Sequence, residues 1–176
     1  MPLIDAGNSQ LVIIDFQARL MPAIAGGAEA VANARRLAEA ARLLGVPALI
    51  TEQNPRGLGP TVAELAGFAP VVEKMAFGAC AEPAFAAALD PDRVLVVVGC
   101  EAHVCVLQTV LGLRAKGRAV CLVADAVGSR RDENKRAAIN RMAHHGAEIV
   151  TTEMVVFEWL RDADHPLFQP VRKLIV

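Results

Sequence analysis

Residues 93–110 read Arg93-Val-Leu-Val-Val-Val-Gly-Cys-Glu-Ala-His-Val-Cys-Val-Leu-Gln-Thr-Val110. The five consecutive apolar residues from Val94 to Val98 are typical of a strand that is buried on both faces, as in a parallel sheet. After this run the apolar spacing changes to one that suits a helix, with Val106 and Val110 on one stripe. The segment therefore predicts a strand, a tight turn and a helix, with Cys105 in the first turn of the helix.

The position of Cys105 favours a reactive thiol. Backbone N–H groups without intrahelical partners and the positive end of the helix dipole lie at the first turn of a helix, and both stabilise a thiolate. We therefore expect Cys105 to act as a nucleophile.

The composition predicts one compact domain spanning residues 1–176, because 54% of the residues are hydrophobic and 21% are charged. So much apolar surface also predicts self-association as a homo-oligomer. Lys and Arg number 18 against 19 Asp and Glu, so no basic excess favours a nucleic-acid partner. The chain shows neither the roughly 18 apolar residues of a membrane span nor a signal peptide. We therefore expect no membrane partner and a cytoplasmic location.

The sequence contains four cysteines, none of them in a CxxC pair: Cys80, Cys100, Cys105 and Cys121. Without a secreted context, reduced thiols are expected in place of a disulfide framework.

The rest of the chain alternates between strand and helix patterns. Strands are expected at residues 11–14, 46–50, 71–72, 94–98, 119–123 and 148–151. Helices are expected at 27–44, 61–65, 82–89, from 102 onward, at 129–146 and at 152–160. This alternation predicts an α/β fold of three α/β/α layers, with a doubly wound, mostly parallel sheet of six strands.

Three residues whose side chains could take part in catalysis follow expected strands. Asp15 comes directly after the first strand, Lys74 lies two residues after the third, and Cys105 follows the fourth. Open α/β proteins bind ligands at the carboxyl ends of their strands, where these side chains would meet. A thiol nucleophile needs a base to take its proton or a cation to stabilise its thiolate. The trio supplies both, although Asp15 taken alone is better explained as a turn or helix cap and Lys74 taken alone as a solvated side chain.

Histidine is the usual alternative base for a thiol. His103 lies two residues before Cys105 and would point away from it on a helix. His144 and His145 are better explained by their place near a helix C-terminus, where the helix dipole favours positively charged side chains. The sequence therefore offers no histidine that is expected to act as the base for Cys105.

Other residues are candidates for substrate binding. Gln53 lies in a polar loop and either faces a ligand or satisfies loop backbone groups. Phe16 and Phe77 flank the expected site and either sandwich a flat or apolar substrate or pack in the core.

The chain resembles the isochorismatase-like cysteine hydrolases, a family that includes nicotinamidases and several carbamoyl or amide hydrolases. The resemblance spans nearly the whole chain. It rests on these segments: Val12-Ile-Ile-Asp-Phe-Gln17, Val72-Glu-Lys-Met-Ala-Phe77, Gly99-Cys-Glu-Ala-His-Val-Cys-Val106 with Gln108-Thr109, Asp125-Ala-Val-Gly-Ser-Arg130 and Thr151-Thr-Glu-Met154.

The resemblance implies roles for the trio: Cys105 as nucleophile, Asp15 as general base and Lys74 orienting both. It also implies a cis peptide between Cys100 and Glu101. This turn would aim the N–H groups of Glu101 and Cys105 at the oxygen of the substrate, so that they form an oxyanion site.

Two departures from the family pattern affect the expected substrate. Nicotinamidases carry a metal site of an aspartate and histidines shortly after the second strand, whereas this chain has Thr51-Glu-Gln-Asn-Pro-Arg-Gly57 there. We therefore expect no metal and no cofactor, and nicotinamide is a poor candidate substrate. Many members have a threonine where this sequence has Ala102, beside the expected substrate.

The sequence thus predicts a cysteine-dependent hydrolase that acts on a small amide or related C–N bond through a thioester. One alternative is a catalytically silent oligomeric scaffold of the same fold. Another is a redox role for Cys100 and Cys105, which strand-to-helix geometry disfavours because it points their sulfurs apart.

Overall fold

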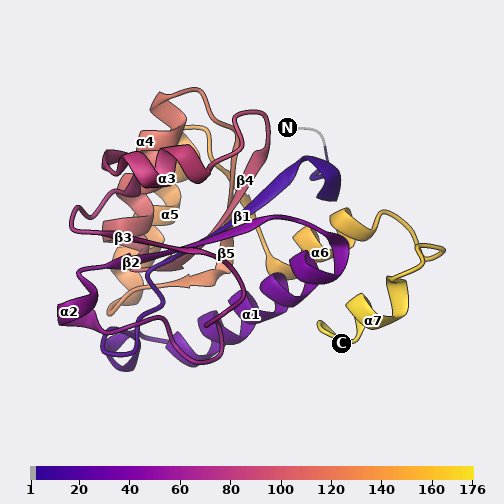
Figure 1. Ribbon diagram of the computed structural model, residues 1–176, viewed down its shortest axis with the longest axis horizontal. Helices are drawn as coiled ribbons and strands as arrows, with labels where there is room; N and C mark the ends of the chain where they lie inside the picture. Colours follow the sequence, from indigo (N-terminus) through magenta and orange to yellow (C-terminus); the bar gives the residue numbers. More distant parts are fainter. Residues whose placement is uncertain (1–2) are drawn as a thin grey trace.

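The computed structural model describes residues 3–176, whose six strands form one parallel sheet with helices on both faces (Figure 1). The strand order is β3-β2-β1-β4-β5-β6. This confirms the predicted doubly wound α/β fold and its six strands. Residues 1 and 2, which begin the expected 1–176 domain, lie outside the described part of the chain.

Strands and helices alternate along the chain. The strands are β1 (Ser9–Ile14), β2 (Ala48–Gln53), β3 (Val71–Lys74), β4 (Val94–Cys100), β5 (Val120–Gly128) and β6 (Glu148–Val150). The α-helices are α1 (Gly27–Leu44), α2 (Pro55–Leu58), α3 (Pro83–Ala88), α4 (Leu107–Ala115), α5 (Asp132–His144), α6 (Thr152–Leu160) and α7 (Phe168–Arg172). The shorter helical turns are η1 (Ala6–Asn8), η2 (Met21–Ala23), η3 (Ala79–Ala81) and the π-helical turn η4 (Ala102–Val106). Within residues 3–176, no helix is long and apolar enough to cross a membrane.

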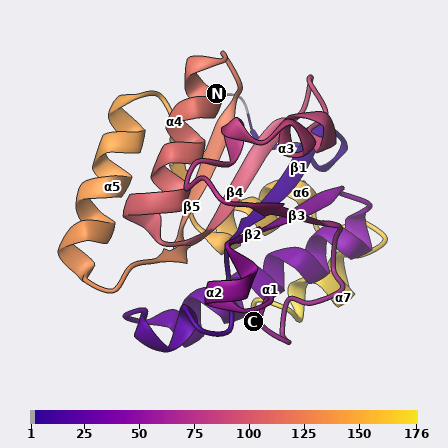
Figure 2. The ribbon, with the colours of Figure 1, turned by 60° about the vertical axis from the view of Figure 1, so that its left-hand side comes forward.

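The sheet separates two hydrophobic cores. Leu11 and Ile13 of β1 share one core with α1, α6 and α7, while Val12 and Ile14 share the other with α3, α4 and α5. Figure 2 shows α4 and α5 on one side of the sheet and α1 on the other. Because successive residues of a strand point to opposite faces, a strand between two cores needs an uninterrupted apolar run. This explains why the central strands were recognisable from sequence.

The strand order reverses between β1 and β4. From β1 the chain continues to β2 and β3 on one side, and from β4 to β5 and β6 on the other. Such a reversal opens a crevice at the carboxyl ends of the two strands. Gly99 permits their close approach, because a Cβ atom at this position, where φ is 148°, would lie 2.4 Å from the carbonyl oxygen of Ile14. The reversal therefore brings the chain segments after β1 and β4 together.

Several expected element boundaries are wrong. Residues 61–65 form turns and not a helix, because the amide and hydroxyl of Thr61 both donate to Glu52 Oε1, at 2.6 and 2.7 Å. The helix of this loop is the short α2. Strand β5 continues to Gly128 after a register shift against β4, and α5 begins at Asp132, because Ser129 pairs with Ala25 in an isolated bridge.

Candidate active site

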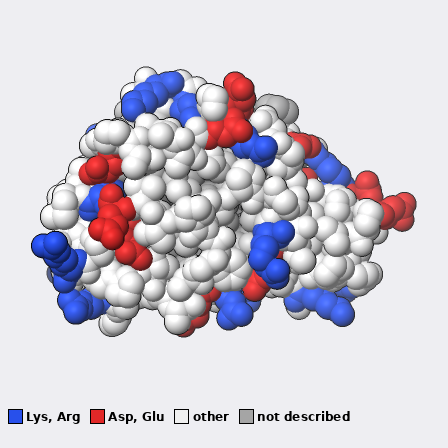
Figure 3. All heavy atoms as spheres, viewed as in Figure 1, with Lys and Arg blue, Asp and Glu red and all other residues white. Residues whose placement is uncertain are grey.

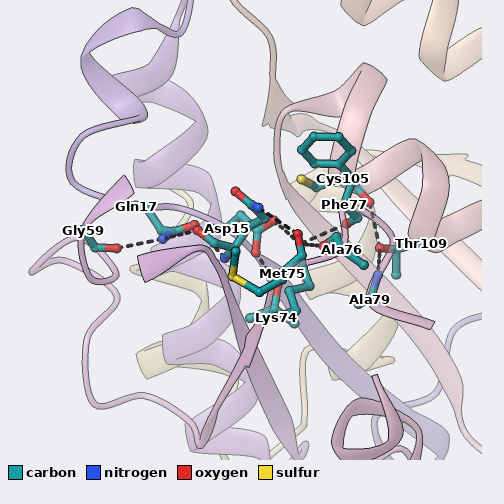
Figure 4. A network of polar contacts seen from close by, with 12 residues as sticks. Asp15, Gln17, Gly59, Lys74, Met75, Ala76, Phe77, Ala79, Cys105 and Thr109 are labelled. Atoms are coloured by element: carbon teal, nitrogen blue, oxygen red, sulfur yellow. Dashed lines mark hydrogen bonds and ion pairs between the residues drawn. The ribbon is translucent and has the colours of Figure 1, made fainter. Parts of the chain in front are cut away.

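Asp15 follows directly after β1 and is fully buried. Its φ of 51° lies in the left-handed region, which aspartate tolerates better than most residues. Its Oδ1 accepts a 2.7 Å hydrogen bond from Thr51 Oγ1, and its Oδ2 accepts one of 2.7 Å from Lys74 Nζ (Figure 4). Both carboxylate oxygens are therefore fixed by side chains from the neighbouring strands β2 and β3.

Lys74 is the last residue of β3, and its ammonium is held by three oxygens. Besides Asp15 Oδ2, Nζ donates to the carbonyl oxygens of Phe77, at 2.9 Å, and Ala76, at 3.2 Å. A buried ion pair requires such saturation, because each desolvated charge must find partners. Lys74 is therefore an internal cation and not the solvated side chain that its residue type alone suggests.

Cys105 lies in η4, directly before α4, and its thiol is almost entirely buried. Burial, with a smaller contribution from the negative charge of Asp15, raises the pKa of the thiol to about 12, while Lys74 acts in the opposite direction. The charges of Asp15 and Lys74 both act on the thiol, in opposite directions. Burial and the neighbouring carboxylate thus outweigh the cation and the helix terminus, both of which favour a thiolate. The resting thiol is neutral and lies beside an acceptor for its proton.

Thr109 ties the turn that carries Cys105 to the loop that follows Lys74. Its Oγ1 donates to the carbonyl oxygen of Cys105 at 2.7 Å and accepts from the amide of Ala79 at 3.0 Å (Figure 4). The hydroxyl is fully buried. Thr109 therefore fixes the position of the nucleophile relative to the cation, a role that its place in the sequence did not suggest.

The peptide bond between Cys100 and Glu101 is cis, as the family resemblance implied. The buried carboxylate of Glu101 accepts from the backbone amide of Arg130 at 2.9 Å and from its Nε at 3.1 Å. Close by, His103 Nδ1 lies 3.0 Å from Ser129 Oγ. The turn before the nucleophile is thus fastened to the segment that follows β5, and Arg130 is a second site residue that the sequence argument missed.

A cavity of about 350 Å³ opens onto Cys105, with walls that include Arg19, Gln53, Phe77, Glu101 and Arg130. Phe77 is 52% exposed and lies beside the nucleophile on this wall. Gln53 fits both of its expected roles, because it lines the cavity while its Nε2 donates to the carbonyl oxygen of Met75 at 2.9 Å.

Two expected substrate contacts are wrong. Phe16 is 0% exposed and packs in the core beneath α1, since the chain turns after Asp15 and directs the next side chain into the interior. Ala102 is also fully buried and packs in the opposite core with residues of α4. Neither side chain lines the cavity over Cys105.

The side-chain oxygens of Thr51 and Glu52, near the end of β2, are engaged inside the protein. Thr51 donates to Asp15 and Glu52 accepts from Thr61. Across residues 3–176, no three His, Cys, Asp or Glu side chains are grouped in a way that could hold a metal ion. All four cysteines are free thiols.

The sequence model of the isochorismatase domain matches residues 9–154. The chain belongs to this family. It is 39% identical to the mouse isochorismatase domain-containing protein 2A over 173 residues, which cover 96% of this chain and 82% of the mouse protein. This membership places the protein among the isochorismatase-like hydrolases.

Two solved structures show how widely the fold is shared. The MAR1 ribonuclease from Caenorhabditis elegans superposes with a TM-score of 0.93 at 38% identity, covering 98% of this chain and 91% of that one. YcaC from Pseudomonas aeruginosa, solved with hexane-2,5-diol and covalent acrylamide, gives a TM-score of 0.91 at 26% identity, with the same coverage of 98% and 91%. The isochorismatase-domain fold therefore extends over almost the entire chain.

Proposed function

We propose that this isochorismatase-domain protein is a metal-independent cysteine hydrolase that cleaves small amides or related C–N bonds. The observation that carries the proposal is the buried ion pair of Asp15 and Lys74, whose charges both act on the thiol of Cys105, while Cys105 itself lines a cavity large enough for a small molecule. A proton acceptor and a cation thus lie behind a nucleophile that a ligand can reach.

In the first half of the reaction, the carboxylate of Asp15 takes the thiol proton while the sulfur of Cys105 attacks the carbonyl carbon of the substrate. The negative oxygen of the tetrahedral intermediate accepts hydrogen bonds from the N–H groups of Glu101 and Cys105, and each such donor is typically worth about 3 kcal/mol. Asp15 then gives the proton to the leaving amine, the C–N bond breaks, and an acyl thioester remains on Cys105.

In the second half, Asp15 takes a proton from water, and the hydroxide attacks the thioester. The C–S bond breaks, the carboxylic acid leaves, and the proton returns to the sulfur. The high pKa of Cys105 fits this sequence, because the thiol proton leaves only as the new bond forms. Lys74 holds Asp15 in place and balances its charge throughout.

The Pseudomonas aeruginosa relative supports a reactive group in this fold, since its structure holds covalent acrylamide. The Caenorhabditis elegans relative is named a ribonuclease. A ribonuclease must bind the phosphate backbone, and this chain has a net charge of -1. The proposal therefore keeps a small-molecule substrate, with no nucleic-acid or membrane partner.

The proposed assembly is a homo-oligomer of one hydrolase domain. The edge strand β3 and the loop after it expose the large apolar side chains of Val71, Met75 and Phe77, and a second copy would cover them. Figure 3 shows that the middle of one face is largely free of charged side chains. The four free thiols support a cytoplasmic location.

The test is a screen of small amides for release of ammonia or amine by the wild-type protein and by the Cys105→Ala and Cys105→Ser variants. We expect turnover by the wild type only, with unchanged circular dichroism for both variants. Cys80→Ala is the matched control, because Cys80 is also a free thiol but lies away from the cavity. Turnover retained by Cys105→Ala refutes the proposal, and the absence of turnover on every amide favours the silent scaffold.

A further inference from the structure

The cavity over Cys105 carries two cations and one carboxylate on its walls. The cations are Arg19 and Arg130, and the carboxylate is that of Glu101. Glu101 is already engaged, since Arg130 donates to it from both its backbone amide and its Nε. Arg19 is therefore the cation whose charge the cavity wall leaves unbalanced.

Arg19 is held in place without being neutralised. Its Nη1 donates to the carbonyl oxygens of Arg56 and Gly57, at 3.1 and 3.2 Å. Within residues 3–176, these are the hydrogen bonds of the Arg19 guanidinium, and no carboxylate pairs with it. A guanidinium has five N–H donors in a planar fork, so its Nη2 and Nε remain available to an anion. Two backbone carbonyls thus orient a free cation at the cavity.

The cavity that Arg19 and Cys105 share is lined largely by apolar side chains, those of Leu20, Ala23, Leu58, Phe77 and Val104. A ligand that fills about 350 Å³ therefore meets a nucleophile, an apolar wall and a fixed guanidinium. This arrangement suits a short apolar spacer between a reactive carbonyl and a singly charged anion.

We propose that the substrate is a small amide that carries a carboxylate, and that Arg19 binds this carboxylate while the amide carbonyl lies at Cys105. The inference rests on the proposed hydrolase function and specifies its substrate class. One carboxylate matches the single unbalanced charge of the cavity, and its two oxygens match the fork of the guanidinium. Arg19 is then a specificity-determining residue and not a catalytic one.

The experiment measures binding separately from turnover, by calorimetric titration of the Cys105→Ala protein. The two probes are succinamate and butyramide, which have the same chain length and differ in a terminal carboxylate or methyl group. We expect succinamate to bind at least about tenfold more tightly, as a charge-assisted hydrogen bond requires. Arg19→Gln should abolish the preference, and Arg19→Lys should keep only part of it.

The matched control is Arg56→Gln, which removes the same charge from an exposed neighbour whose side chain is not on the cavity wall. It should leave the preference unchanged. Equal binding of the two probes, binding of neither, or a preference that survives Arg19→Gln overturns the inference. Because Arg19 is exposed, its variants should fold, and circular dichroism checks this.

The outcomes separate the two proposals. Tight binding of succinamate without hydrolysis by the wild-type protein contradicts the hydrolase function and leaves the anion site standing. Hydrolysis of neutral amides with no preference for succinamate contradicts the anion site alone.

Discussion

Lys74 donates a 2.7 Å hydrogen bond to Asp15 from the end of β3, although β2 lies between that strand and β1. Thr51 of β2 donates to the other oxygen of the same carboxylate. Three adjacent strands thus each contribute one polar side chain to a buried cluster beside Cys105. The cluster is structural as well as chemical, because a buried charge without its partner is costly.

Lys74→Met should therefore destabilise the protein by about 3–5 kcal/mol, because it leaves the carboxylate of Asp15 buried and unpaired. Urea unfolding followed by circular dichroism measures the change. The double variant Asp15→Asn with Lys74→Met should lose much less stability than the sum of the two single variants. Strictly additive effects would show that the two side chains do not interact.

Asp15→Asn should lower the pKa of Cys105, although it removes the proposed base. Burial is the main cause of the raised pKa of the wild-type thiol, about 12, and the carboxylate adds to it, so removing the carboxylate while Lys74 stays favours the thiolate. The pH profile of iodoacetamide labelling at Cys105 should therefore shift to lower pH. Labelling of Cys80 in the same digest is the internal control, and a profile that stays in place or moves to higher pH is inconsistent with this electrostatic arrangement.

Thr109→Val should disturb the position of Cys105, because the Thr109 hydroxyl holds the turn that carries it. The substitution preserves shape but leaves the carbonyl of Cys105 and the amide of Ala79 without their hydroxyl partner. We expect a loss of roughly 2 kcal/mol in unfolding free energy and slower modification of Cys105. Thr109→Ser, which keeps the hydroxyl, should retain most of both properties. If Thr109→Ser is as impaired as Thr109→Val, the hydroxyl is not the cause.

Buried thiols should lower the free energy of unfolding of the protein at alkaline pH. Burial, with Glu148 and Glu158, raises the pKa of Cys121 from 9.0 to about 12. Between these values the unfolded thiol loses its proton while the folded one keeps it, so stability falls as pH rises above about 9, by up to about 1.4 kcal/mol per pH unit. Cys121→Ala should flatten this decline when unfolding is followed from about pH 8 to about pH 11. An equally steep decline in the variant would assign the effect to other groups.

The strands and α1 were predictable because their signals are local. Apolar runs of β1 and β4 identify strands between two cores, and the sequence prediction for α1 at 27–44 matches the helix observed. The trio of Asp15, Lys74 and Cys105 was also accessible, since each residue follows a strand whose end lies at one edge of the sheet.

The supporting contacts were not predictable, because they join segments that only the folded chain brings together. Arg130 meets Glu101 across 29 residues, and Thr109 meets Ala79 across 30. The raised pKa of Cys105 was not predictable for a related reason: local helix geometry favours a thiolate, whereas the burial and the carboxylate of Asp15 that raise the pKa depend on the tertiary structure. The same limit applies to Phe16, whose burial follows from the turn of the chain after Asp15.

The most direct test of Cys105 as the nucleophile is its acylation by p-nitrophenyl acetate, followed by mass spectrometry of the digested protein. We predict one acetyl group on the peptide that carries Cys105, formed with a burst of nitrophenol and absent from Cys105→Ala. Acetylation of Cys80 or another residue at the wild-type rate, with Cys105 unmodified, would contradict the account.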